Sequence, residues 1–282
     1  MSLSVQWIGQ NFPDLSQIIP LASGGFKQVY AADHPADGAV VLKLIVPVRD
    51  LEDINREILA VQAVASDRVP KILCHGSIDT VFGTCYWIRE QRVVGGTLRE
   101  LLAVEPLTPR EVLRLGKDIL QALVQAESAN IVHRDVKPEN IVRDANGQYW
   151  LLDFGIARHL TLDSRTASML PFGKMTPGYA PPEQASNIKK AIDPRADLFA
   201  VGVTLYEAAI GVNPFTRGAR DIHEILTRVN SVPMPSLNLQ LIRAKSFADF
   251  VACMTQKRRD HRPPSVAAAN VWLKEICVAE GL

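Results

Sequence analysis

Strand-like and helix-like hydrophobic patterns alternate over the first third of the chain. Residues 40–46 are apolar and mostly β-branched, which predicts a buried strand with one lysine, Lys43, inside it. Residues 50–65 repeat apolar side chains at helical spacing, and residues 86–90 have the composition of a strand. The pattern therefore predicts a small sheet accompanied by one helix. Residues 1–14 carry no assignment.

Helical patterns dominate the remainder of the chain. Residues 108–111 read Thr-Pro-Arg-Glu, a capping box with proline at the first helical position, and apolar residues follow at helical spacing to Ala126. Residues 197–210 are apolar almost throughout and end before Gly211, which predicts a buried helix with a glycine C-cap. Two more helices are expected near residues 241–254 and 265–276. The fold class predicted is α+β.

Composition excludes several classes of protein. The 31 basic and 30 acidic residues give a net charge of +1, so no bulk field favours nucleic acid or an anionic membrane. The four cysteines form no CxxC pair and indicate reduced thiols in a cytoplasmic protein. Residues 1–10 lack the basic and apolar parts of a secretory signal. The most apolar run, residues 198–210, is shorter than the ~20 residues of a membrane span.

Two short motifs concentrate the polar chemistry. Residues 133–140 read His-Arg-Asp-Val-Lys-Pro-Glu-Asn, and Asp153 opens the triplet Asp-Phe-Gly. Asn-Gly at positions 146–147 between two β-rich runs predicts a hairpin that returns Asn140 beside Asp153. A carboxylate to orient a hydroxyl, oxygen ligands for magnesium and a nearby cation are the groups that phosphoryl transfer requires.

These motifs, over roughly residues 15–276, resemble those of the Hanks-type serine/threonine protein kinases of bacteria and eukaryotes. The resemblance implies a bilobal fold, with an antiparallel-sheet N-lobe at residues 1–92 and a mainly helical C-lobe at residues 93–282, together one kinase domain. It also implies ATP and Mg²⁺, with Mn²⁺ as an alternative metal, and a protein substrate that offers a Ser or Thr hydroxyl.

The same resemblance assigns roles in the second part of the chain. Asp135 would orient the acceptor hydroxyl and Lys137 would neutralise charge on the migrating phosphoryl group. Asn140 and Asp153 would hold the metal through oxygen, the ligand atom that magnesium prefers. Thr176 stands where the family has a threonine that bonds to the catalytic aspartate and lysine. Lys137 and Thr176 both favour serine/threonine over tyrosine substrates.

In the first part of the chain, Lys43 and Glu57 are expected to form an ion pair. A lysine inside an apolar strand is costly unless its ammonium finds an anion, although it can also snorkel to solvent. In the family this lysine contacts the α- and β-phosphates and a helix glutamate. Glu57 lies roughly 80° from the centre of the apolar helix stripe and Glu52 roughly 140°, so Glu57 is the expected partner. The alternative is that Glu57 is a surface charge that pairs with a neighbouring arginine.

The nucleotide itself is expected to meet a loop and a linker. Residues 21–30 resemble the family's glycine-rich loop, and the residues assigned to nucleotide binding there are Leu21, Ala22, Gly24, Gly25, Phe26 and Val29. Ala22 and Lys27 replace two of the family's glycines. Backbone groups of residues 90–93, with Glu90 and Arg92 named as binding residues, are expected to read the adenine edge. Arg89 is placed near the back of the adenine site, in a stretch one residue longer than usual.

Residues 153–183 correspond to the activation segment. Glu183, in a Pro-Pro-Glu triplet, is expected to pair with Arg262 in a buried bidentate contact, and Asp197 is expected to brace the catalytic loop. Four hydroxyl residues lie inside the segment and are candidates for autophosphorylation: Thr161, Ser164, Thr166 and Ser168. Arg134 could receive a phosphate added to one of them. A mobile polar loop is the alternative.

Two other functions compete with an active protein kinase. A pseudokinase, which binds nucleotide or acts as a scaffold without turnover, is favoured by Ala22, Lys27 and Arg89. The spacing between Lys43 and Glu57, which is shorter than the family usually shows, also favours it. The complete set of polar residues at positions 43, 135, 137, 140 and 153 opposes it. A small-molecule phosphotransferase of similar fold would keep the catalytic residues, but such enzymes typically lack the Pro-Pro-Glu segment and the Thr176 position.

Overall fold

The computed structural model describes residues 3–23, 27–45, 58–154, 175–185 and 192–282. The chain divides into two compact units. Of the described residues, unit 1 contains those up to Gln62 together with Pro70–Val93, and unit 2 contains Ala63–Val69 together with those from Val94 onward. The predicted α+β class is confirmed, since unit 1 is built on a sheet and unit 2 is mainly helical.

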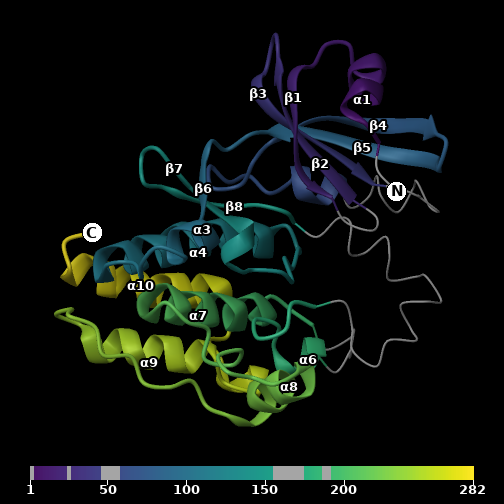
Figure 1. Cartoon of the computed structure of the whole chain (residues 1–282). Helices are drawn as coiled ribbons and strands as arrows, with labels where there is room; N and C mark the ends of the chain where they lie inside the picture. The colour runs from purple at the N-terminus through teal and green to yellow at the C-terminus, as the bar shows by residue number, and fades with distance from the viewer. Residues whose placement is uncertain (1–2, 24–26, 46–57, 155–174, 186–191) are drawn as a thin grey trace. The chain divides into compact units, whose positions relative to one another are not determined.

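Unit 1 is built on a five-stranded antiparallel sheet with strand order β1-β2-β3-β5-β4 (Figure 1). Its strands are β1 Ser16–Ser23, β2 Lys27–His34, β3 Gly38–Ile45, β4 Ile72–Thr80 and β5 Gly83–Gln91. Gly38 and Gly83 begin β3 and β5 after tight turns, and both have positive φ, of 70° and 100°. The strand expected at residues 86–90 therefore falls within β5. The strand expected at residues 40–46 agrees with β3 as far as Ile45, and residue 46 lies outside the described residues.

Only the end of the helix expected at residues 50–65 lies in the described part of the chain. Residues 58–62 are helical, and Ile58 is fully buried against Ile45, Tyr86 and Ile88 of the sheet. Glu57, the predicted partner of Lys43, lies outside the described residues.

The N-terminal segment, which the sequence left unassigned, packs on the same sheet. Helix α1, Val5–Asn11, begins at Ser4, whose side chain accepts the N–H of Trp7. The Leu3 N–H donates to Gln28 Oε1 at 2.9 Å, and the Tyr30 hydroxyl donates to the Leu3 carbonyl at 2.6 Å. The buried apolar side chains of the segment join the core of the sheet: Leu3, Ile8, Phe12 and Leu15.

Unit 2 holds a short three-stranded sheet and most of the helices. The strands, in the order β6-β7-β8, are Gly95–Thr97, Ile141–Asp144 and Tyr149–Leu151. The α-helices are α3 Leu98–Leu102, α4 Pro109–Ser128, α6 Pro182–Ala185, α7 Arg195–Ile210, α8 Ile222–Ser231, α9 Ala244–Met254 and α10 Val266–Ala279. Two 3-10 turns, η1 Pro138–Asn140 and η4 Arg259–His261, complete the described elements.

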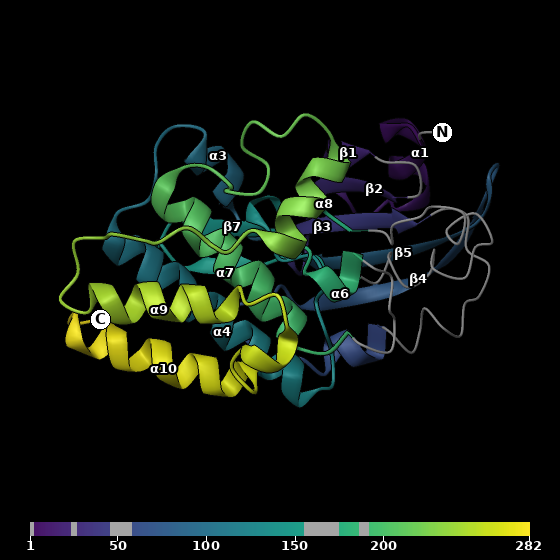
Figure 2. The ribbon, with the colours of Figure 1, turned by 90° about the horizontal axis from the view of Figure 1, so that it is seen from below.

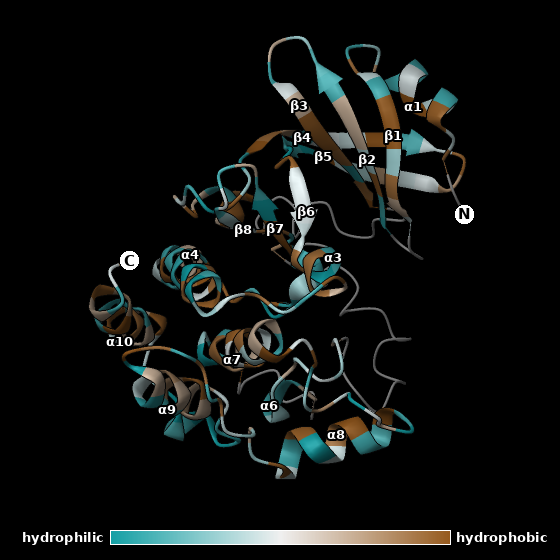
Figure 3. Cartoon of the chain, turned by 60° about the vertical axis from the view of Figure 1, so that its left-hand side comes forward, coloured by the Kyte–Doolittle hydropathy of each residue, from teal (hydrophilic) through white to brown (hydrophobic). Residues whose placement is uncertain are grey.

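Helix α7 is the centre of unit 2. It is buried on nearly all sides and packs against α4, α9 and α10, which lie alongside one another in Figure 2. Much of α7 and α10 is hydrophobic (Figure 3), as expected for helices that form a core. The predicted glycine cap is present, because the N–H of Gly211, at φ 85°, bonds to the Glu207 carbonyl at 2.7 Å. Over the described ranges, no helix combines the length and apolar character that crossing a membrane requires.

A lysine ammonium lies among the aromatic side chains beside α7. The Lys257 Nζ atom is 4.3 Å from the ring centroid of Phe215 and 5.4 Å from that of Phe199. Within the described part of the chain this buried ammonium has no hydrogen-bond partner. Burial, followed by the charge of Arg262, lowers the pKa of Lys257 to about 8. The cation–π contacts thus compensate only part of the cost of removing this charge from water.

Replacing Lys257 by methionine should stabilise the protein at neutral pH, because the substitution removes a poorly solvated charge and keeps the apolar stem. The folded-state pKa of about 8 lies below the usual 10.5, so the unfolded chain binds more protons between these values. Wild-type stability should therefore rise with pH over that interval, and the advantage of Lys257→Met should shrink. Urea denaturation at a series of pH values measures this difference, and the exposed Lys274→Met is the matched control. A Lys257→Met advantage that stays constant from pH 7 to pH 10 would contradict the expectation.

Candidate active site

The loop that carries Asp135 is held by a buried carboxylate. Asp197, on the first turn of α7, accepts the backbone N–H of His133 and that of Arg134, each at 2.7 Å. Burial raises the pKa of Asp197 to about 7, against the effect of the two N–H groups. Arg134 lies at φ 65°, a conformation that a non-glycine residue adopts only under local constraint. The expectation that Asp197 braces this loop is confirmed.

His133 connects the loop to the residues that follow β8. Its Nδ1 accepts the N–H of Asp135 at 3.2 Å, so the ring proton belongs on Nε2, which lies 2.8 Å from the Leu152 carbonyl. The ring also meets Phe154 edge-on, with 4.7 Å between centroids. The neutral imidazole therefore holds the Asp135 loop and the Asp153 loop together.

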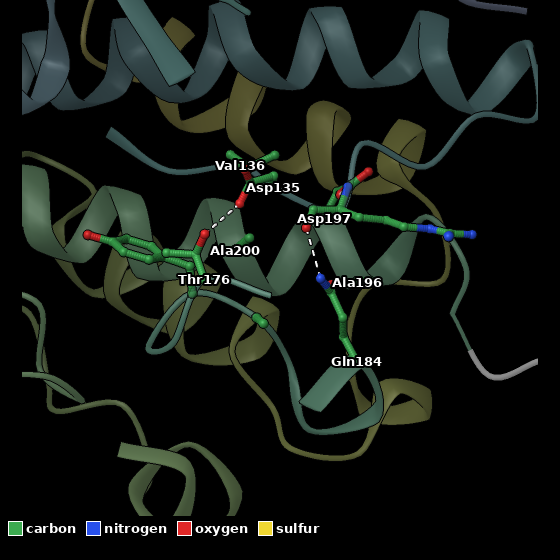
Figure 4. A pocket seen from close by; sticks show the side chains of 10 residues that line it. Asp135, Val136, Thr176, Gln184, Ala196, Asp197 and Ala200 are labelled. Atoms are coloured by element: carbon green, nitrogen blue, oxygen red, sulfur yellow. Dashed lines mark hydrogen bonds between the residues drawn. The ribbon is translucent and has the colours of Figure 1, made fainter. Parts of the chain in front are cut away.

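Asp135, Lys137 and Thr176 form one hydrogen-bonded group. The Thr176 hydroxyl donates to Asp135 Oδ1 at 2.7 Å and accepts from Lys137 Nζ at 2.8 Å. Lys137 Nζ is also 3.0 Å from Asp135 Oδ2. Figure 4 shows Thr176 pointing at Asp135 beside a small pocket whose wall includes the start of α7. The contacts expected of Thr176 are present, and they fix the direction of the Asp135 carboxylate.

Asn140 and Asp153 bring two further side-chain oxygens, which could act as metal ligands, to this part of unit 2. Asn140 Nδ2 donates to the backbone carbonyl of Asp135 at 2.9 Å and to its Oδ2 at 3.0 Å, which turns the amide oxygen away from that residue. The Leu152 N–H donates to the Asn140 carbonyl at 2.8 Å. The predicted hairpin is formed by the antiparallel strands β7 and β8. Because this hairpin brings Leu152 back to Asn140, the next residue, Asp153, lies near Asn140.

The two donors suit magnesium better than a structural metal. Magnesium is usually held by one or two carboxylates together with substrate phosphates and water. The described residues contain no group of three or more His, Cys, Asp or Glu side chains that could hold a metal. The carboxylate of Asp153 and the amide oxygen of Asn140 are ligand types that fit such a magnesium site.

The end of the activation segment is anchored by the expected ion pair. Arg262 Nη1 and Nη2 donate to the two carboxylate oxygens of Glu183 at 2.6 and 3.0 Å, and the Arg262 side chain is fully buried. On the neighbouring residue, Gln184 Nε2 donates to the Arg134 carbonyl at 2.9 Å (Figure 4). The segment is thereby attached to both the core and the Asp135 loop. The four candidate phosphorylation sites at positions 161–168 lie outside the described residues.

In unit 1, Lys43 forms an ion pair that the sequence did not predict. Its Nζ contacts Glu90 Oε1, and both side chains are largely buried. Val41 lies opposite Glu90 and Lys43 lies opposite Ile88 on the neighbouring strands β3 and β5, so the two charged residues share one face of the sheet. The sequence predicts only a backbone role for Glu90. The signal that could have found the pair is a carboxylate at the end of a strand that is expected to lie beside the strand of Lys43.

The placement of Arg89 at the back of the adenine site is wrong. Neighbouring residues on a strand point to opposite faces, and Arg89 lies on the face away from Lys43. Its guanidinium bonds to Asp14 at 2.7 Å and to Asp37 at 3.3 Å. Glu90, not Arg89, therefore shares the face of the sheet that carries Lys43.

The expected nucleotide-binding residues of unit 1 are only partly described. Ala22 lies opposite Val29, and Val29 lies opposite Lys43, which places these three residues in a row across β1, β2 and β3. Leu21 is an exposed residue of β1. Gly24, Gly25 and Phe26 lie outside the described residues.

Part of the backbone expected to read adenine is already engaged in unit 1. The N–H groups of Gln91 and Arg92 donate to the carbonyls of Lys71 and Ala39 at 2.8 and 3.1 Å. Adenine recognition through the N–H of Arg92 is therefore not supported. Glu90 and Gln91 are paired with β3 as residues of β5, whereas Val93 follows the strand and its backbone remains a candidate.

The chain is similar to known proteins over most of its length. The family described as "Protein kinase domain" matches residues 16–273. Serine/threonine-protein kinase PknL of Mycobacterium tuberculosis is 33% identical over 263 residues, which cover 91% of this chain and 64% of that protein. The probable serine/threonine-protein kinase PknB of Corynebacterium glutamicum is 34% identical over 208 residues, or 69% of this chain and 31% of that protein. The chain thus spans less than two thirds of the length of these relatives.

Replacing Glu90 by glutamine should weaken unit 1, because a buried ammonium then loses one anionic partner. We expect a loss of roughly 1–3 kcal/mol in the free energy of unfolding. In a double-mutant cycle with Lys43→Met, the two losses should not add, and the coupling should be of similar size. Denaturant titration of the four proteins measures it.

The exposed Glu105→Gln serves as the control for removal of one carboxylate, and it should change stability by less than ~0.5 kcal/mol. Losses of Glu90→Gln and Lys43→Met that add within ~0.5 kcal/mol would show that the ion pair does not contribute to stability.

Proposed function

Because this chain belongs to the protein kinase domain family, we propose that it is an ATP-dependent serine/threonine protein kinase. It transfers the γ-phosphoryl group of ATP to Ser or Thr hydroxyls of protein substrates. The observation that carries this proposal is the hydrogen-bonded group of Asp135, Lys137 and Thr176. It presents an oriented carboxylate next to a fixed ammonium, the arrangement that an incoming hydroxyl and a migrating phosphoryl group need.

In the proposed reaction the acceptor hydroxyl donates a hydrogen bond to Asp135, and this bond directs the hydroxyl oxygen toward the γ-phosphorus of ATP. As the new P–O bond forms, the bond between the γ-phosphorus and the oxygen bridging to the β-phosphate breaks, ADP leaves, and Asp135 receives the hydroxyl proton. Lys137, already 3.0 Å from this carboxylate, offsets the negative charge on the transferred group. Asn140 and Asp153 would hold Mg²⁺, which neutralises the phosphate charge when bound. Thr176 holds the Asp135 carboxylate and the Lys137 ammonium in place through its hydroxyl and does not itself react.

The nucleotide side of the proposal rests on unit 1. Lys43 contacts the phosphates. Glu90 is its partner in the folded chain, and Glu57 is the second anionic partner proposed for it. The adenine edge is read by backbone groups of residues 90–93, the stretch that contains Glu90 and Arg92. The residues proposed to cover the nucleotide are Leu21, Ala22, Gly24, Gly25, Phe26 and Val29.

The location and the partner belong to the same proposal. The four cysteines are free thiols, which suits the reducing cytoplasm. A protein that offers a Ser or Thr hydroxyl is the proposed partner. No nucleic acid is proposed, because the net charge of +1 provides no attractive field.

Purified protein should transfer γ-phosphate from ATP to a mixed set of Ser/Thr peptides in the presence of Mg²⁺. Asp135→Asn should lower kcat by ~100-fold or more, because the oriented proton acceptor is lost. Lys43→Met should lower activity through nucleotide binding or positioning. Radiolabel transfer measures both, and the exposed Glu275→Gln is the control that should retain wild-type rates. No transfer with Mg²⁺ or Mn²⁺ would reject the proposed activity and favour the pseudokinase alternative.

We further expect autophosphorylation at one or more of the hydroxyl residues in positions 161–168. The phosphate would pair with Arg134, which lies beside the catalytic aspartate. Mass spectrometry of the wild type and of Asp135→Asn after incubation with ATP measures the modification. Equal phosphorylation of the two proteins at these positions would count against it.

A further inference from the structure

Arg99, on helix α3, joins three elements of unit 2 through three of its nitrogens. Its Nε donates to Glu139 Oε1 and its Nη1 to Glu207 Oε1, each at 2.7 Å. Its Nη2 donates to the Tyr179 hydroxyl at 2.6 Å. The Tyr179 hydroxyl in turn donates to Glu207 Oε2. One guanidinium thereby satisfies two carboxylates from different parts of the chain.

The members of this cluster differ in their exposure. The Glu207 side chain, from α7, is 5% exposed, whereas Arg99 is 38% and Glu139 45% exposed. Burial opposes the charge of Arg99, but the bonds to Glu207 and Glu139 outweigh it and raise its pKa. Burial, followed by the charge of Glu207, raises the pKa of Tyr179, which stays protonated. The cluster is therefore a buried carboxylate covered by an arginine that solvent can reach.

The cluster adjoins the proposed acceptor site along two chain segments. Glu139 is two residues from Lys137, and Tyr179 is three residues from Thr176, whose hydroxyl bonds to Asp135. Three residues of extended chain span at most ~11 Å. A peptide with its acceptor hydroxyl at Asp135 would thus bring a residue two or three positions away within reach of this cluster.

We propose that Arg99 determines the charge preference of the peptide substrate, by occupying from within the chain the place that a substrate cation would otherwise take between Glu139 and Glu207. The inference rests on the proposed kinase function and extends it to substrate selection. Arg99 leaves a local charge of about −1, from one cation and two carboxylates, and it uses the acceptor atoms that a substrate guanidinium would need. A basic residue near the acceptor hydroxyl should therefore raise the kcat/KM of a peptide only slightly.

A purely structural role for Arg99 would predict something different. Removal of Arg99 would then lower stability or rate equally for all peptides, whereas the proposal predicts a change in the ratio between peptides. In Arg99→Ala the buried Glu207 and the exposed Glu139 lose their shared cation, and a buried unpaired carboxylate is costly. A peptide arginine at the right position would restore the missing contacts.

The test compares peptides with one acceptor serine and a single Arg, Ala or Glu two or three positions to either side. For the wild type, we expect kcat/KM for Arg and Ala peptides to agree within ~3-fold. For Arg99→Ala, the Arg/Ala ratio should rise by roughly tenfold at one position, the equivalent of one charge-assisted hydrogen bond of ~1.4 kcal/mol. Adding Glu139→Gln to Arg99→Ala should cancel most of that gain.

Circular dichroism and melting temperature verify that each variant folds. If Arg99→Ala does not fold, Glu139→Gln alone decides, because it changes an exposed side chain and lowers the local charge to about zero. It should then raise the Glu/Ala ratio by ~3-fold. Unchanged ratios in a folded Arg99→Ala, or in Glu139→Gln where that variant decides, would overturn the proposal. So would a wild type that already prefers Arg by tenfold.

Binding separates this inference from the kinase activity itself. Fluorescence anisotropy with labelled peptides that carry Ala in place of the acceptor serine gives the same Arg/Ala comparison without phosphoryl transfer. Wild-type protein that phosphorylates no peptide would reject the proposed function, while a tenfold rise in the binding ratio for Arg99→Ala would still support the role of Arg99. An unchanged binding ratio would reject that role whatever the activity.

Discussion

The hydrogen bonds from two backbone N–H groups to Asp197 are the constraint on which the candidate site depends. The carboxylate lies at the start of α7, the most deeply buried helix of unit 2, so its position is fixed by the core rather than by the loop. His133 and Arg134 must bring their N–H groups to it, and Arg134 adopts a positive φ in doing so. The strain of one residue and the burial of one carboxylate are offset by two short hydrogen bonds.

From that anchor the other polar groups follow through short links. The neutral ring of His133 links the Asp135 loop to the Leu152 carbonyl, after strand β8. The side-chain amide of Asn140, before strand β7, donates to the Asp135 carbonyl. Both ends of the β7–β8 hairpin are therefore tied to the Asp135 loop. On the opposite side, the Glu183–Arg262 pair fixes the segment that delivers Thr176 to the same carboxylate. The folded chain thus holds the side chains around Asp135 in fixed directions before any substrate binds, which the proposed catalysis by positioning requires.

The sequence was sufficient wherever function depended on short separations along the chain. The Asp135 loop, the hairpin to Asp153 and the capped helix α4 are local, and their residue types determine their geometry. Thr176 and Arg262 could be placed through the family resemblance. The sequence could not place Glu90 against Lys43, because a shift of one residue in strand register exchanges the two faces of a sheet. It could not join Arg99 to Glu207, since 108 residues separate them and only tertiary packing brings them together.

The unpredicted contacts have a common physical origin. Lys43 and Glu207 are charged groups placed where water is scarce, and each needs an opposite charge in the folded chain. On the proposed function, a nucleotide phosphate at Lys43 would meet an ammonium already paired with Glu90, and a substrate cation at Glu207 would meet a carboxylate already paired with Arg99. In both places the folded chain already contains the charge that a ligand would bring. Affinity and selectivity therefore depend on the difference between the internal and the external partner, not on the strength of either alone.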